Sequence, residues 1–150
     1  MMKSIPAGLL IAAMLSTQAL AAPAQPAEIG RIKTATGQAS VVRGVQTLPA
    51  APGLTLSAKD VLTTGRDGRI GVTFIDNSRF AVGPNARVAL TEFQFDDTTH
   101  KGASLTEVDR GSLAVVSGQI AKENKDGMKV KTPTSLLAAR GTRFVVEVPR

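Results

Sequence analysis

The middle of the chain alternates apolar and polar residues with a period of two, and this pattern constrains the fold more than any other. In residues 69–74, Ile, Val and Phe alternate with Arg, Gly and Thr, and the alternation resumes at Phe80 and Val82. A period of two is that of a β-strand with one apolar face. Between the two runs lies Asp-Asn-Ser at 76–78, where Asp and Asn favour a tight turn because they tolerate positive φ. The pattern predicts a β-hairpin.

Similar punctuation recurs along the rest of the chain. Pairs or triplets containing Gly mark further expected reversals, at 67–68, 83–85, 110–111 and 126–127. Short apolar and β-branched runs lie between these signals, at 37–43, 88–93, 113–116 and 143–148. Many short strands with regular turn signals are typical of a sandwich or jelly roll. We therefore predict an all-β fold, a single β-sandwich or jelly-roll-like domain of short antiparallel strands and hairpins.

Helical patterning is scarce. Residues 59–62 could form one helical turn, and residues 135–139 have a helix-forming composition. The second segment is too short to be stable alone as a helix. Because it lies between two strand signals, we expect a strand or an extended crossover there.

The N-terminal residues have the features of a signal peptide. A basic start at Met1–Lys3 precedes the apolar run Ile5–Leu15, and Ala19-Leu20-Ala21 matches the small-x-small rule for cleavage after Ala21. The apolar run is shorter than the about 20 residues that a membrane helix needs. We predict a cleaved signal peptide at 1–21, a flexible Pro/Ala linker at 22–28, and one β domain at 29–148. The expected location is therefore periplasmic or secreted, with no membrane span.

Composition narrows the choice of partners. The chain has no Cys, so the exported domain cannot be stabilised by disulfides. Lys and Arg number 18 against 12 Asp and Glu, for a net charge of +6, which favours anionic partners electrostatically. The basic residues are scattered singly rather than in the runs that mark nucleic-acid tails. We expect no nucleic-acid partner.

Residues for catalysis or metal binding are few. There is no Cys nucleophile and only one His, His100, in a polar segment with Asp96 and Asp97. These three could in principle ligate a metal, but their spacing matches no calcium loop, and zinc usually takes more His or Cys. A solvated hairpin tip explains the segment better. We predict no enzymatic activity, no metal and no cofactor.

Aromatic residues are limited to five Phe, all in expected strands. Sugar-binding sandwiches usually use Trp or Tyr platforms, and single-stranded nucleic acid also needs aromatic stacking. Phe93 and Phe95 share one strand face, which indicates core packing; an exposed face would instead offer an apolar patch to a partner.

The same signals form five short motifs in order: Asp-Val-Leu-Thr-Thr-Gly at 60–65, the hairpin at 69–80, Gly-Pro-Asn-Ala-Arg-Val at 83–88, Leu105 with Arg-Gly-Ser-Leu at 110–113, and Thr132-Pro133 with Arg140-Gly141-Thr142-x-Phe144. In this order they resemble the FecR domain, and the resemblance covers Ile29 to Val148. Each motif alone is only a set of turn residues between apolar alternations, so the order is what is specific. Asn77 replaces a usual glycine, which turn chemistry permits. Ala139 replaces a preferred Val.

The resemblance implies a periplasmic module linked to ferric-siderophore sensing. Signalling members resemble a three-part device, with a cytoplasmic segment that binds a sigma factor, one membrane helix and this domain outside. The present sequence resembles the outer domain only. We therefore expect the fold to carry over and the iron-transport signalling to carry over poorly.

Arg140, Gly141 and Thr142 are the candidate ligand-binding residues. An Arg guanidinium at a turn could bind an anion or a peptide. Alternatively, Gly141 supplies a backbone conformation that other residues cannot, and Arg140 bonds to nearby carbonyls. Because the triplet lies between apolar residues, the structural role is the better prediction.

These observations together predict an exported, non-enzymatic interaction module of the bacterial envelope. It would recognise an envelope protein or an anionic envelope component through a sheet face or an edge strand. An edge left open after Val148 would also permit self-association. Two alternatives stay open: a soluble accessory of a transmembrane signalling system of the iron-transport regulator type, and a polysaccharide-binding module.

Overall fold

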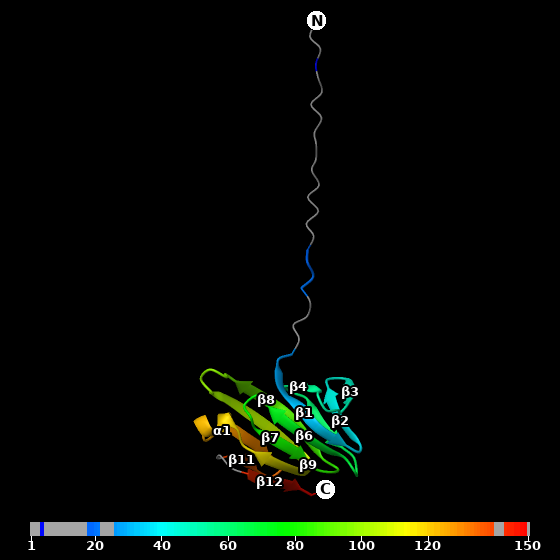
Figure 1. Ribbon diagram of the computed structural model, residues 1–150, viewed down its shortest axis with the longest axis vertical. Helices are drawn as coiled ribbons and strands as arrows, with labels where there is room; N and C mark the ends of the chain where they lie inside the picture. The colour runs from blue at the N-terminus through cyan, green and yellow to red at the C-terminus, as the bar shows by residue number, and fades with distance from the viewer. Residues whose placement is uncertain (1–3, 5–17, 22–25, 140–142, 150) are drawn as a thin grey trace.

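The computed structural model describes residues 4, 18–21, 26–139 and 143–149 (Figure 1). Within them lie twelve strands and one short helix: β1 (Glu28–Thr36), β2 (Ala39–Arg43), β3 (Gln46–Pro49), β4 (Thr55–Ser57), β5 (Val61–Thr64), β6 (Arg69–Phe74), β7 (Arg79–Val82), β8 (Arg87–Phe95), β9 (Gly102–Val116), α1 (Gln119–Glu123), β10 (Met128–Lys131), β11 (Leu136–Ala138) and β12 (Arg143–Val148). The all-β prediction is confirmed.

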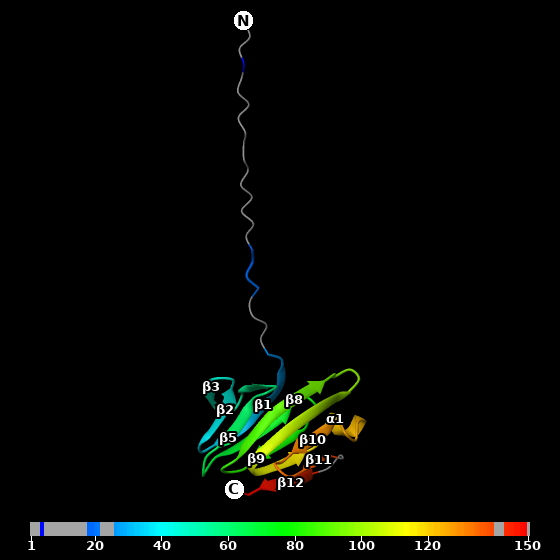
Figure 2. The ribbon, with the colours of Figure 1, turned by 180° about the vertical axis from the view of Figure 1, so that it is seen from behind.

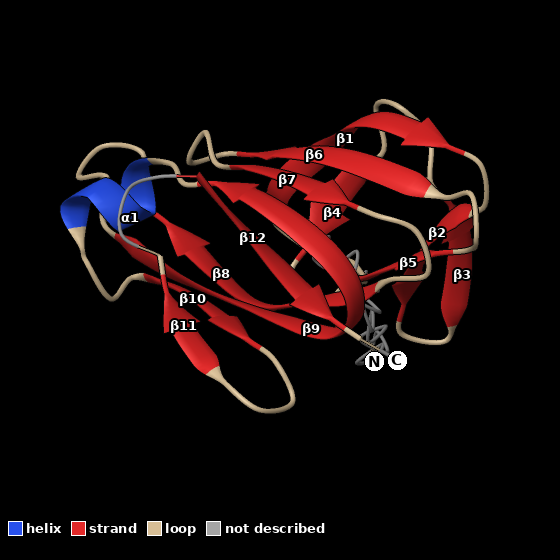
Figure 3. Ribbon diagram, turned by 90° about the horizontal axis from the view of Figure 1, so that it is seen from below, coloured by secondary structure: helices blue, strands red, loops and turns tan. Residues whose placement is uncertain are grey.

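The strands form one curled sheet whose two halves face each other (Figure 3). Layer A has the order β4-β1-β6-β7-β9-β12, and layer B has the order β3-β2-β5-β8-β9-β10-β11. Neighbours are antiparallel except for β9 and β10, which run parallel. Figure 1 is seen from the side of layer A, and Figure 2 from the side of layer B.

Strand β9 belongs to both layers. Its first part pairs with β8 and β10, and its last part, from Leu113 on, pairs with β7 and β12. The transition lies at Gly111, which has a φ of 85°. The predicted reversal at Arg110-Gly111 is therefore wrong: the left-handed glycine redirects a continuous strand from one layer to the other, as in a β-bulge.

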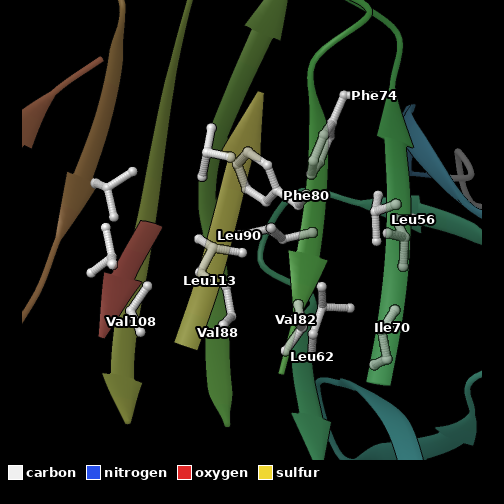
Figure 4. Packing of buried hydrophobic residues seen from close by; sticks show 14 of the residues in the cluster. Leu56, Leu62, Ile70, Phe74, Phe80, Val82, Val88, Leu90, Val108 and Leu113 are labelled. Carbon is white, nitrogen blue, oxygen red and sulfur yellow. The ribbon is translucent and has the colours of Figure 1, made fainter. Parts of the chain in front are cut away.

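The core lies between the layers, and the period-two pattern determines which side chains enter it. Ile70, Val72 and Phe74 are at most 3% exposed, whereas Arg69 on the same strand is exposed. Figure 4 shows Leu62, Phe80 and Leu113 pointing into this space from three different strands. The predicted hairpin β6–β7 is confirmed, with Asn77 at φ 67° in its turn.

Local predictions outside this hairpin had mixed outcomes. The expected helical turn at 59–62 is wrong, because Lys59 lies in a turn with φ 74° and Val61 begins β5. The expected extended segment at 135–139 is confirmed as β11. The reversals at 67–68 and 126–127 are confirmed as turns. Helix α1 was not predicted; it has five residues, two of them buried.

The predicted signal peptide (1–21) and linker (22–28) lie largely outside the described residues, and β1 begins at Glu28. In the part of the chain that the structure describes, no helix has the length and apolarity needed to cross a membrane.

Candidate functional site

The sequence motifs were examined first as sites, because they are the most specific features of the chain. Thr64, in the first motif, donates a hydrogen bond to the carbonyl oxygen of Gly83 at 2.6 Å and accepts one from the amide of Ala86 at 2.9 Å. The amide of Asn85 donates to the carbonyl oxygen of Gly65 at 2.9 Å. The first motif therefore holds the turn formed by the third motif.

Asp60 starts the same motif and is 1% exposed. Its carboxylate accepts hydrogen bonds from Arg43 Nε at 2.9 Å and Nη2 at 2.8 Å, and from the Ser57 amide at 2.9 Å. The hydrogen bond to Asp60 raises the pKa of the Arg43 guanidinium, so this cation stays charged throughout the accessible pH range. The pair joins β2 to the turn between β4 and β5, which is a structural role.

Asp76, in the hairpin motif, is fully buried. Its carboxylate accepts hydrogen bonds from the amide and hydroxyl of Ser78, and more weakly from the amide of Ile120 at 3.4 Å. Gly118 permits this approach, because a Cβ there would lie 2.3 Å from the Asp76 carbonyl oxygen. The hairpin motif thus anchors the start of α1.

The last motif divides between described and undescribed residues. Thr132 Oγ1 accepts a hydrogen bond from the Ser135 amide at 3.0 Å and closes the turn between β10 and β11. Arg140, Gly141 and Thr142, the predicted candidates for ligand binding, lie outside the described residues. Every described motif therefore holds turns together, and none presents a free functional group.

The segment with His100 is the tip of the β8–β9 hairpin, as predicted. Asp96 Oδ1 accepts hydrogen bonds from the amides of Thr98 and Thr99, and the His100 ring stacks on Phe95 with centroids 6.2 Å apart. Across the described residues, no group of three or more His, Cys, Asp or Glu has the geometry to hold a metal ion.

The five Phe all lie in strands, as predicted. Phe93 and Phe95 are partly buried and pack against the core, and Phe93 stacks on Phe74 with ring centroids 5.3 Å apart. The prediction of core packing is confirmed for both residues.

The outer face of layer A carries a different arrangement, which the strand register creates. Five residues in consecutive register across β1, β6, β7, β9 and β12 form what we call the small-residue row: Thr34, Gly71, Ala81, Ala114 and Val145. They contribute to the floor of a shallow depression of about 300 Å³. Small side chains here leave the backbone of four adjacent strands open to a flat partner.

Beside the small-residue row runs an arginine row, again in consecutive register: Arg31, Thr73, Arg79, Val116 and Arg143. The three arginines stand two strands apart, which corresponds to about 9.5 Å between neighbouring arginine positions. On the opposite side of the small-residue row, Arg69 lines the same depression.

The charges on this face are mostly of one sign. Arg31 pairs with Glu28 at 3.0 Å, but both side chains are more than 40% exposed, so that pair is weak. Among the described residues, no acidic group lies within salt-bridge distance of Arg69, Arg79 or Arg143. The outer face of layer A thus combines a flat floor with unpaired cations, and it is our candidate binding surface. Sequence reasoning missed it, because the two rows exist only through the register of five strands.

A larger groove, of about 620 Å³, lies over β9 and β10 beside the β10–β11 turn. Its charges are of both signs, since Glu92 and Asp126 line it together with Lys129 and Lys131. Lys131 is also within 3.6 Å of Glu107. The buried Ser104 hydroxyl has no hydrogen-bond partner within the described chain, but Ser104 stands across from Phe93 and Met128 and faces the core. The groove therefore has no charge preference.

The fold and this surface define an all-β domain with a basic, flat recognition face. The chain belongs to the FecR family: the family model described as FecR protein matches residues 60–150, more than half of the chain. This family is a regulatory and signalling family, not known for enzymatic activity, and its domains are periplasmic in that context. Comparisons with curated proteins and with solved structures gave no match.

Proposed function

We propose that this protein is an exported, non-enzymatic binding module of the bacterial envelope that recognises an acidic segment of a partner protein on the outer face of layer A. A signal peptide at 1–21 would direct it to the periplasm or beyond. The observation that carries the proposal is the arginine row, in which Arg79 and Arg143 face solvent beside a floor of small residues without an acidic neighbour at salt-bridge distance in the described chain.

The chemistry of the face supports an acidic partner. Guanidinium groups bind carboxylates through two parallel hydrogen bonds, which gives geometric selection as well as charge. Arg69 and Arg79 stand on either side of the small-residue row, so a chain lying over Gly71 and Ala81 would have a cation on each side. The net charge of +6 would also increase the rate of encounter with an acidic molecule.

A protein partner fits this face better than a polysaccharide. Sugar rings stack on flat aromatic side chains, and the outward positions of β6, β7, β9 and β12 carry none. FecR-type domains also act in signalling together with envelope proteins. The same family context agrees with a regulatory binding role rather than with catalysis.

The proposal can be tested by fluorescence anisotropy with a labelled poly-glutamate peptide and the full chain. We expect binding that Arg79→Glu and Arg69→Glu each weaken roughly tenfold, because each replaces an attraction by a repulsion. Lys129→Glu is the matched control, since Lys129 is an exposed strand residue on the outer face of layer B. Polygalacturonate serves as the sugar polyanion and should bind more weakly than the peptide.

Two results would contradict the proposal. Equal loss of affinity in Lys129→Glu and Arg79→Glu would show that net charge alone causes binding. Tighter binding to polygalacturonate, with the same dependence on Arg79, would assign the face to an acidic polysaccharide instead.

A further inference from the structure

Strand β12 forms one edge of layer A. In the part of the chain that the structure describes, it is hydrogen bonded to β9 on one side, and no strand pairs with its other side. Figure 1 shows β12 at the margin of the layer. An unpaired edge presents backbone N–H and C=O groups to which another strand can bond.

The side chains of β12 divide cleanly between the two faces of the layer. Phe144, Val146 and Val148 are buried or half-buried and face the core, whereas Arg143, Val145 and Glu147 face outward. Val145 is 66% exposed, which is unusual for a large apolar residue on a strand. The outward residues are thus a cation, an apolar residue and an anion, at equal spacing.

This order is complementary to itself when it is reversed. In an antiparallel pair formed by two copies of β12 about Val145, Val145 stands across from Val145 of the second copy. Arg143 then stands across from Glu147 of the second copy, and Glu147 across from its Arg143. Opposite charges directly across an antiparallel pair stabilise it, and a two-fold axis forms the favourable contact twice.

Other registers lose this match. A shift that centres the pair on Val146 or on Phe144 keeps the two layers continuous but separates Arg143 from Glu147. A shift by one residue pairs outward side chains of one copy with core-facing side chains of the other. Only the register centred on Val145 satisfies both the charges and the faces.

The same register extends the candidate binding surface. Val145 ends the small-residue row, so pairing it with Val145 of a second copy joins two such rows end to end across the axis. The arginine row of one copy then leads to Glu147, Ser112 and the neighbourhood of Arg69 in the other. The depression that one copy forms is doubled in length.

We propose that the partner of the β12 edge is a second copy of this chain, joined in an antiparallel strand pair centred on Val145, so that the two copies form one continuous outer face. This inference does not depend on the acidic partner proposed above, because it concerns a different part of the strand, its edge.

Charge exchange tests the register. We expect the full chain to dimerise reversibly in sedimentation equilibrium or in light scattering coupled to size exclusion. Arg143→Glu and Glu147→Arg should each raise the dissociation constant roughly tenfold, since each turns two attractions into two repulsions. The double variant restores opposite charges across the pair and should dimerise as the wild type does. Lys129→Glu, on the outer face of layer B, should leave the dissociation constant unchanged.

Cross-linking tests the position of the axis. The chain has no Cys, so a single introduced thiol reacts alone. In Val145→Cys, the two thiols would lie across the axis with Cβ atoms about 5 Å apart, within reach of a short bifunctional thiol reagent. In Glu147→Cys, the two positions are offset by four residues along the strands, or about 13 Å, and should not cross-link.

The outcomes separate this inference from its rivals. A chain that is monomeric at all accessible concentrations, or a double charge variant that fails to restore the dimer, would overturn it. Cross-linking that is equal at both positions would overturn the register. If the monomer instead takes up an unrelated strand peptide along β12, the edge serves a different partner. Loss of the dimer by Arg143→Glu with poly-glutamate binding through Arg79 intact would leave the proposed function standing.

Discussion

Thr64 Oγ1 donates a hydrogen bond to the carbonyl oxygen of Gly83 at 2.6 Å, across 19 positions of sequence. The same oxygen accepts a hydrogen bond from the amide of Ala86 at 2.9 Å. One buried hydroxyl therefore holds both ends of the turn between β7 and β8. Because this turn lies against Gly111 of β9, the contact also supports the point at which β9 changes layer.

Thr64→Val should lower the free energy of unfolding by about 2 kcal/mol. Valine keeps the shape of the side chain but leaves the amide of Ala86 and the carbonyl of Gly83 without this partner. Urea denaturation followed by circular dichroism measures the change. Thr47→Ala, at an exposed position of β3, should change stability by less than about 0.5 kcal/mol. Equal effects at the two positions would show that the hydroxyl of Thr64 has no special role.

Removal of Arg43 should be more harmful than its partial exposure suggests. Its side chain is 33% exposed, but Asp60 is 1% exposed and would remain as a buried carboxylate with a single Ser57 amide bond. Arg43→Met should therefore cost about 3 kcal/mol. In Arg43→Met combined with Asp60→Asn, much of that loss should be recovered, because no unpaired charge remains. A double variant as unstable as the single one would exclude the ion pair as the cause.

Gly111→Ala and Gly44→Ala separate backbone strain from steric overlap. Both glycines have positive φ, 85° and 59°. A Cβ at Gly111 would lie 2.5 Å from the Cα and Cβ atoms of Ala86, whereas one at Gly44 would meet no atom within 4 Å. We expect a loss of about 1 kcal/mol at Gly44 and about 3 kcal/mol or more at Gly111, measured by thermal or urea unfolding. Similar losses would mean that the close approach of β9 to Ala86 is relieved easily.

Ser104→Ala should stabilise the protein. The Ser104 hydroxyl is buried and lacks a hydrogen-bond partner within the described residues, so its removal eliminates a desolvation cost of about 1 kcal/mol. Ser40→Ala is the matched control, since the Ser40 hydroxyl lies 2.6 Å from Thr63 Oγ1 and its loss should be destabilising. Opposite signs in the two melting temperatures are the expected result. A lower melting temperature for Ser104→Ala would indicate that its hydroxyl is satisfied in solution.

Binding of poly-glutamate should weaken as salt is added. The arginines of layer A are exposed, and the Debye length is about 10 Å at 0.1 M salt and about 3 Å at 1 M. Anisotropy titrations at several salt concentrations measure the effect. In Arg79→Glu the salt dependence should become shallower, because fewer ion contacts remain to be screened. Affinity that is independent of salt would exclude electrostatic recognition.

Local sequence patterns predicted the strands that a local pattern can specify. The alternation at 69–74 and the Asp-Asn-Ser turn depend on neighbouring residues only, and both are confirmed. Residues 110–111 were misjudged because a turn and a bulge both need a left-handed glycine. The difference between them is made by Ala86, 25 positions earlier, which no local signal reveals.

The candidate surface was beyond local prediction for the same reason. Arg79 and Arg143 look like isolated basic residues in the sequence, and each faces outward by the period of its own strand. Their alignment requires that both stand across from Val116, which depends on the pairing of β9 with β7 and with β12. The self-complementary order of β12 could be read in the sequence, but only once its outward face was known.

The passage of β9 through both layers has a mechanical consequence. Four strands, β7, β8, β10 and β12, are hydrogen bonded to this one segment, so the two halves of the molecule cannot swing apart like the leaves of a hinge. A load applied to β12 passes directly into the central strand and is shared by both halves. Such a body signals by being occupied or vacant and by bringing its partners together, while its own shape stays constant.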